Sequence, residues 1–122
     1  MTTWITICET CKREGWEAGA PTDGARLAGL IEALDPGPLK LRRHSCLMGC
    51  THGCNVTVQA AGKLCYTIGR FEPTQEAAEA IRDWALLHAA SETGQVPYRQ
   101  WPEAIKGHFV TRHPPLPGPG AE

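Results

Sequence analysis

The chain has 122 residues, and its 12 basic and 13 acidic side chains nearly balance. This length favours one domain with a modest core, and the balanced charge gives no indication of nucleic acid or an anionic membrane surface as a partner. No apolar stretch approaches the roughly 20 residues that span a bilayer, and the first seven residues are too few and too polar for an export signal. We therefore expect a cytoplasmic protein, in which clustered cysteines are metal ligands or redox centres rather than disulfides.

The first predicted elements are a strand and a helix separated by a loop. Residues 3–7 are rich in β-branched and aromatic side chains, as strands are, and lead directly into Cys8 and Cys11. Residues 14–22 are rich in glycine and proline and are predicted to form a loop. A helix is predicted over 23–34, capped by its first residue, Asp23, because leucine and isoleucine recur there at three- and four-residue steps.

A second strand and a hairpin are predicted on either side of the remaining clustered cysteines. Residues 39–44 form a strand that delivers the chain to Cys46. Residues 55–59 alternate as a strand does, residues 61–63 provide a tight turn, and residues 64–68 return as the hairpin partner.

The C-terminal third is predicted to contain one helix followed by irregular chain. The helix opens at Pro73 and Thr74 and runs to about residue 91, and the chain is irregular from residue 93 onward. The Pro- and Gly-rich residues 113–122 are predicted to be a disordered tail. The predicted domain therefore comprises residues 1–112.

The order of these elements predicts an α/β fold with a small mixed sheet. The order is β-α-β, a cysteine loop, a β-hairpin and a second helix. The first two strands, joined by a helix, should be parallel, and the hairpin strands antiparallel. A right-handed crossover places the first two strands side by side. The cysteines that follow their ends should then meet at one edge of the sheet, where open α/β folds usually place their sites.

Five of the six cysteines form two clusters with metal-ligand spacing. The first is a Cys-x-x-Cys pair, and the second is a run of three cysteines with three residues between neighbours. Thiolates at such spacings usually share a metal, provided that the chain curls so that the sulfurs converge. The clustered cysteines are Cys8, Cys11, Cys46, Cys50 and Cys54.

Three kinds of site fit this pattern. Four cysteines are the ordinary ligand set of a [2Fe–2S] cluster. They would equally hold a structural zinc ion, although zinc ribbons prefer two residues between both ligand pairs. A thioredoxin-type dithiol at Cys8 and Cys11 is the third interpretation, but such a pair normally stands at a helix N-terminus, whereas a loop is predicted after Cys11.

Basic residues near the cysteines would offset the charge of a cluster. Two ferric ions, two sulfides and four thiolates leave a net charge of about −2. The bases predicted close to the thiols, either as compensating charges or as a solvated rim, are Lys12, Arg13, Arg42, Arg43 and Lys63.

The other candidate residues are predicted to lie outside the ligand set. Cys65 is isolated on the hairpin and is interpreted as a small buried hydrophobe. His52 is interpreted as a loop residue that hydrogen-bonds a sulfur or water rather than as a ligand. No Ser-His-Asp, paired-carboxylate or Cys-His arrangement stands out, so we expect an electron carrier or metal-binding protein and not an enzyme.

Taken with the order of elements, these motifs resemble a bacterial family of small predicted metal-binding proteins, related to the thioredoxin-like [2Fe–2S] ferredoxins. The resemblance covers roughly residues 3 to 112. The motifs that carry it are Cys8-x-x-Cys11, Cys46-Leu-x-x-Cys50-x-x-x-Cys54, Gly62-Lys63-x-x-Tyr66-x-x-Gly69 and Val96-Pro97.

The resemblance implies a thioredoxin-like fold with an irregular C-terminal extension and a [2Fe–2S] cluster used in one-electron transfer with redox protein partners. It also implies a homodimer. The alternative is a zinc- or cobalt-binding structural or metal-handling protein, which the family links to cobalamin metabolism. No nucleic-acid or membrane partner is expected.

The predicted cluster ligands are Cys8, Cys11, Cys46 and Cys50. Cys54 is expected close by but outside the ligand set, and it is the alternative fourth ligand. The reason is topological. The first pair follows the first strand and the second pair follows the second strand, and these strand ends should be neighbours. Cys54 begins the next strand, so its side chain should follow the alternation of that strand.

Overall fold

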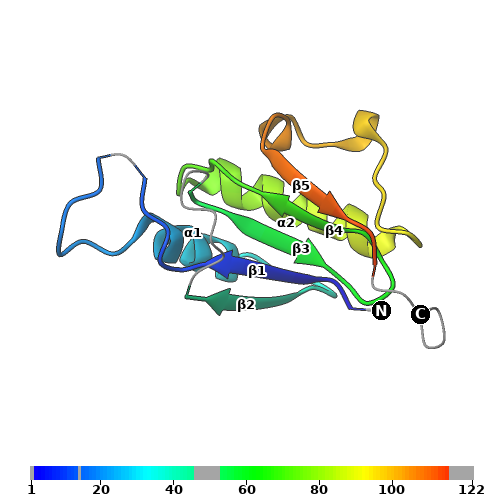
Figure 1. The fold of residues 1–122 in the computed structure, drawn as a ribbon, viewed down its shortest axis with the longest axis horizontal. Helices are drawn as coiled ribbons and strands as arrows, with labels where there is room; N and C mark the ends of the chain where they lie inside the picture. Colours follow the sequence, from blue (N-terminus) through cyan, green and yellow to red (C-terminus); the bar gives the residue numbers. More distant parts are fainter. Residues whose placement is uncertain (1, 14, 46–52, 116–122) are drawn as a thin grey trace.

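The computed structural model describes residues 2–13, 15–45 and 53–115. Its elements form a sheet with helices on one side, and none of the helices within these residues is long and apolar enough to cross a membrane. In chain order (Figure 1) they are β1 (Trp4–Cys8), α1 (Asp23–Glu32), β2 (Lys40–His44), β3 (Val56–Gln59), β4 (Cys65–Ile68), α2 (Gln75–Ala90), the single-turn helices η2 (Tyr98–Gln100) and η3 (Glu103–Ile105), and β5 (Phe109–His113).

The sheet is mixed, as predicted. Its strand order is β2-β1-β3-β4-β5, with β1 and β2 parallel and all other neighbours antiparallel. The helix crossover between β1 and β2 and the hairpin of β3 and β4 confirm the predicted topology. The hairpin pairs with β1, so the end of β1 lies between the end of β2 and the start of β3.

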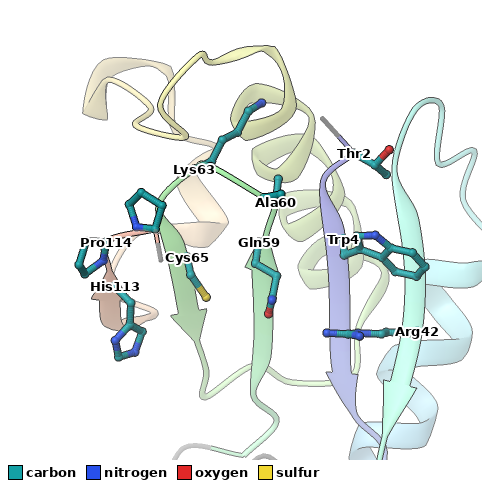
Figure 2. Close-up of a pocket in the computed structure, with 12 residues that line it drawn as sticks. Thr2, Trp4, Arg42, Gln59, Ala60, Lys63, Cys65, His113 and Pro114 are labelled. Atoms are coloured by element: carbon teal, nitrogen blue, oxygen red, sulfur yellow. The ribbon is translucent and has the colours of Figure 1, made fainter. Parts of the chain in front are cut away.

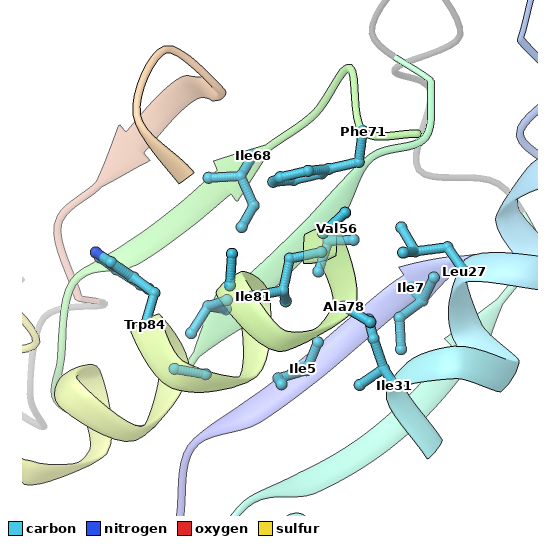
Figure 3. Close-up of a cluster of buried hydrophobic side chains, with 14 of the residues drawn as sticks. Ile5, Ile7, Leu27, Ile31, Val56, Ile68, Phe71, Ala78, Ile81 and Trp84 are labelled. Atoms are coloured by element: carbon cyan, nitrogen blue, oxygen red, sulfur yellow. The ribbon is translucent and has the colours of Figure 1, made fainter. Parts of the chain in front are cut away.

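The core lies between the sheet and the two helices (Figure 3). Alternate residues of the strands face the helices, because side chains of a strand point to opposite faces in turn. The strand side chains that are fully buried there are Ile5, Ile7, Val56, Val58 and Ile68, and the helices contribute Leu27, Ile31, Ala78, Ile81 and Trp84.

The N-cap of α1 differs from the prediction by one residue. Thr22, and not Asp23, is the cap, and its Oγ1 accepts a hydrogen bond from the Ala25 amide at 3.1 Å. The Asp23 carboxylate instead accepts a hydrogen bond from the Arg13 amide at 2.6 Å. Asp23 therefore holds the loop that precedes the helix.

The fifth strand was not predicted. β5 pairs with β4, and the register shifts between Thr67 and Ile68. Four of its five residues are exposed, so the sequence lacks the alternation that would have indicated a strand. His113, placed in the tail by the sequence, is the last residue of β5, whereas residues 116–122 of that tail lie outside the described residues.

A buried polar network ties α2 to the sheet at the end away from Cys8. The Lys63 ammonium donates hydrogen bonds to the carbonyls of His88 (3.2 Å) and Ala89 (2.8 Å), and so caps the C-terminus of α2. Nε2 of His88 lies 2.7 Å from the Leu64 carbonyl and Nδ1 lies 3.0 Å from Thr3 Oγ1. A carbonyl can only accept, so Nε2 carries the proton and the neutral ring satisfies both partners.

This network makes folding stability depend on pH. Burial lowers the pKa of His88 below its usual 6.5, and the charge of Lys63 lowers it further. Below about pH 6.5 the unfolded chain binds a proton at this position that the folded chain does not, so the free energy of unfolding should fall as the pH drops from 7 to 5. Chemical denaturation of a His88→Gln variant should show a flatter profile over this interval. The matched change at an exposed histidine, His113→Gln, should keep the parental slope, and a His88→Gln profile parallel to that of the parent would contradict the assignment.

Candidate metal centre

Three of the clustered cysteines are brought together by neighbouring strand ends. Cys8 is the last residue of β1, and Cys11 follows in the next turn. Cys54 stands two residues before β3, which begins at Val56. Because β1 pairs with β3 and the Cys8 amide donates to the Asn55 carbonyl at 3.2 Å, the two segments lie side by side.

The three thiols are buried and influence one another. Cys8, Cys11 and Cys54 are 2%, 4% and 0% exposed. The pKa of Cys11 is raised to about 12, mainly by burial and also by the hydrogen bond and charge of Cys8 and the charge of Cys54, against a lowering by Asn55. Burial likewise raises the pKa of Cys54 to about 12, with smaller contributions from the charges of Asp23 and Cys8. The thiols therefore form one electrostatically connected group.

Asn55 is a site residue that the sequence did not single out. Its side-chain amide donates a hydrogen bond to Cys11 Sγ at 3.4 Å, and the residue is 1% exposed. A hydrogen bond to a sulfur favours the thiolate and tunes the potential of a bound cluster. The available signal was a polar side chain immediately after Cys54, at the point where a buried strand begins.

The first turn of α1 packs directly against the cysteine turn. The Gly24 amide donates to the Cys11 carbonyl at 2.9 Å, and the Thr22 hydroxyl donates to the Glu9 carbonyl. A Cβ placed on Gly24 would lie 1.9 Å from the carbonyl oxygen of Cys8, so only glycine fits this contact. The helix N-terminus thus lies beside the Cys-x-x-Cys turn in space, although a loop separates them in sequence.

Of the bases predicted near the thiols, Arg13 has the clearest influence on the site. Its Nη1 donates to the Arg70 carbonyl at 3.0 Å, and the next residue, Phe71, exchanges backbone hydrogen bonds with Cys54. Its positive charge lowers the pKa of Cys54, against the larger effect of burial. Arg13 therefore places a cation close to the buried sulfurs.

The other four predicted bases have partners elsewhere. The prediction is wrong for Lys63, because the hairpin turn that carries it lies at the opposite end of the sheet. Lys12 lies 4.5 Å from the ring of Trp16, Arg42 lies 5.6 Å from the ring of Trp4, and Arg43 forms an ion pair with Glu32 at 2.6 Å.

The predicted ligand set is only partly visible. Cys46 and Cys50 lie outside the described residues, as does His52, so the assignment of the four ligands stays a prediction. The described ranges contain no group of three or more His, Cys, Asp or Glu side chains arranged to hold a metal ion. A complete set of four thiolates would therefore have to include side chains from residues 46–52.

Cys54, predicted to lie close by but outside the ligand set, is buried in the same group as Cys8 and Cys11. It stands two residues before β3, exchanges backbone hydrogen bonds with Phe71, and is fully buried like Val56 and Val58. Cys65, by contrast, is half-buried on β4 and belongs to a different part of the sheet. Of the two cysteines predicted outside the ligand set, only Cys54 shares the site with Cys8 and Cys11.

The described thiols have the chemistry of ligands for a thiolate-bound metal group, although by themselves they do not form a complete one. Thiolates are soft ligands that suit iron–sulfur clusters and zinc. Taking several buried thiols to their charged form is costly without a cation, and the described part of the site supplies Arg13 as a nearby positive charge. A bound metal would provide the larger compensation.

Comparison with known proteins gives the class of fold first. The structure of a thioredoxin-like [2Fe–2S] ferredoxin from Aquifex aeolicus matches with a TM-score of 0.58 and 15% sequence identity, over 93% of this chain and 94% of that chain. The fold is therefore thioredoxin-like, as predicted. A family model described as "Protein of unknown function (DUF1636)" matches residues 5–115, and the chain belongs to this family. No curated protein matches it.

The contact between α1 and the cysteine turn can be tested with two glycines of the same helix. Gly24→Ala should destabilise the protein by about 3 kcal/mol, because the new methyl group meets backbone rather than a movable side chain. Gly29→Ala is the matched control, since a Cβ there meets no atom within 4 Å, and it should stabilise by about 0.5 kcal/mol or more. Equal stabilities of the two variants in urea denaturation would refute the close contact.

Proposed function

We propose that this protein is a small [2Fe–2S] iron–sulfur protein that carries one electron between redox partners and is not an enzyme. The observation that supports the proposal best is the buried group of Cys8, Cys11 and Cys54 at the strand ends of a thioredoxin-like fold. A protein of this fold, at low identity, is a [2Fe–2S] ferredoxin.

In this proposal the chain binds, shields and tunes the cluster. Bound, a [2Fe–2S] cluster supplies a one-electron couple. Cys8, Cys11, Cys46 and Cys50 would hold it, with Cys54 as the alternative fourth ligand. Burial of the described thiols excludes water, the Asn55 amide stabilises negative charge on Cys11, and the Arg13 cation favours the electron-rich state.

The thiols favour metal binding over a reactive dithiol. Reactive cysteines of the thioredoxin type have a lowered pKa, so that the thiolate is present at neutral pH. Here burial raises the pKa of Cys11 to about 12. In addition, the Gly24 amide of the α1 N-terminus is bonded to the carbonyl of Cys11 rather than to a sulfur.

Zinc or cobalt is the alternative occupant of the same thiolates. The protein would then be a structural or metal-handling protein, with the link to cobalamin metabolism that the family resemblance implies. Soft thiolate sites accept several metals, and geometry and availability decide which one is loaded. Metal analysis separates this alternative from the cluster.

The expected setting is the cytoplasm, with redox proteins as partners and a homodimer as the assembly. The nearly balanced charge gives the chain no overall electrostatic attraction to nucleic acid or anionic lipid. We therefore include neither nucleic acid nor a membrane among the partners.

The cluster itself is tested by composition and spectroscopy. Protein purified without oxygen should be red-brown, with two iron and two acid-labile sulfide per chain. Dithionite should reduce it by one electron and produce an EPR signal that integrates to one spin per chain. A colourless protein with stoichiometric zinc, and with no iron even after anaerobic reconstitution, would overturn the proposal in favour of the zinc alternative.

The ligand set is tested by single serine substitutions in the cluster-loaded protein. We expect the visible spectrum to be lost or broadened by a change at Cys8, Cys11, Cys46 or Cys50, and largely kept after Cys54→Ser or Cys65→Ser. Retention of iron and sulfide provides the second measurement. If Cys54→Ser abolishes the cluster while Cys8→Ser or Cys11→Ser leaves it intact, Cys54 is a ligand and the assignment must change.

A further inference from the structure

The face of the sheet opposite the helices carries aligned side chains from all five strands. Trp4 stands beside Gln59 across β1 and β3, and Cys65 stands beside His113 across β4 and β5. Directly paired residues point to the same face. Within the described residues neither α1 nor α2 covers this face, because both helices pack on the other side. It is therefore available for contacts that the core does not use.

A groove of about 740 Å³ crosses this face near the Trp4 end (Figure 2). Its volume lies in the range of small-molecule sites. The lining includes Trp4, Arg42, Gln59, Cys65 and His113, and none of the described residues that line the groove is acidic. In a chain with a net charge of −1, a groove whose described lining contains an arginine and no acid favours an anionic ligand.

Arg42 is held in place at one side of the groove. Its Nε donates to Thr6 Oγ1 at 2.7 Å, and its guanidinium lies 5.6 Å from the centre of the Trp4 ring. The side chain extends from β2 across β1 (Figure 2). Among the described residues no carboxylate forms an ion pair with it, whereas the next residue, Arg43, is paired with Glu32. A guanidinium held in this way, with Nη groups that no other described residue engages in a hydrogen bond, matches a carboxylate in bidentate geometry.

Cys65 and His113 line the other side. The Cys65 sulfur faces the groove (Figure 2) and is half-buried, unlike the closed thiols of the metal centre. The Arg42 guanidinium lies over Trp4, and β1 and β4 are separated only by β3, so the guanidinium and Cys65 are about two strand spacings, or about 10 Å, apart. A ligand that reaches both ends must be elongated.

We propose that this groove binds an elongated small-molecule carboxylate, with Arg42 holding the carboxylate and Cys65 and His113 contacting the far end. The Trp4 ring and the small residues Ala60 and Ala61 provide apolar surface for the body of the ligand. The site is separate from the metal centre, so the inference does not depend on which metal the cysteines hold.

Cys65 makes the proposal testable with a pair of probes of equal length. We would compare 6-maleimidohexanoate with its neutral amide on the intact full-length protein. The Cys65 sulfur adds across the maleimide double bond, and the neighbouring carbon takes up a proton. Burial raises the pKa of Cys65, which slows both reagents alike and cancels in their ratio. Modification is quantified by mass spectrometry of the tryptic peptide 64–70, whose only cysteine is Cys65.

We expect the carboxylate probe to modify Cys65 about fivefold faster than the amide. Free hexanoate should reduce this preference, and Arg42→Gln should abolish it. Arg43→Gln is the matched control, because Arg43 pairs with Glu32, and it should keep the preference. Circular dichroism should be used to check that each variant is folded. Arg42→Lys is a milder second variant, in which the rate preference for the carboxylate probe should be reduced but not lost.

Two results would overturn the proposal. The first is an equal rate for the two probes, or a preference that survives Arg42→Gln in a folded protein. The second is a dimer, measured by light scattering, that dissociates on Trp4→Ala or Arg42→Gln, because the face would then be covered by a second copy of the chain. A monomer, or a dimer unaffected by these changes, together with the Arg42-dependent preference supports the proposal.

Discussion

The close contact between the first turn of α1 and the carbonyl of Cys8 is the constraint on which the cysteine site depends. The contact requires a glycine at position 24. The hydrogen bond from the Gly24 amide to the Cys11 carbonyl fixes the direction of the turn that carries Cys11. It also positions Asp23, whose carboxylate holds the amide of Arg13 and so sets where the arginine leaves the backbone. One packing interaction therefore arranges two thiols and the nearby cation, and a single added methyl group would disturb all three.

Burial has opposite consequences for the two kinds of cysteine in this chain. Cys8, Cys11 and Cys54 are closed off from water and raise one another's cost of ionisation. Such an arrangement is unfavourable for nucleophilic thiols, which need an accessible thiolate, but it suits ligands whose protons leave when a metal binds. Cys65 lacks thiol neighbours among the described residues and faces a groove, so its surroundings allow access by small molecules.

Much of the fold could be predicted because its signals are local. The spacing of leucine and isoleucine before residue 34 gives α1, and the alternation on both sides of residues 61–63 gives the hairpin. β5 could not be found in this way, since it is an edge strand with four exposed residues, and its half-buried residue, Phe109, packs on aromatic rings that are distant in sequence. The cap of α1 was misplaced by one residue because Asp23 is recruited by Arg13, a tertiary contact that no helix propensity contains.

The site could be predicted by residue type but not in its surroundings. Cysteine spacing and strand order are enough to place Cys8 and Cys11 at the end of β1, on the side of the sheet where β2 also ends. The positions of the charged side chains depend on which end of the sheet each turn occupies. The sequence did not show this for the hairpin turn, so Lys63 was predicted beside the thiols, whereas it caps the C-terminus of α2. The influence of Cys54 on the pKa of Cys11 illustrates the same limit, because it arises from the pairing of β1 with β3 and not from cysteine spacing. Cysteine spacing thus predicts candidate ligands, whereas tertiary packing decides which charges and hydrogen bonds influence their thiols.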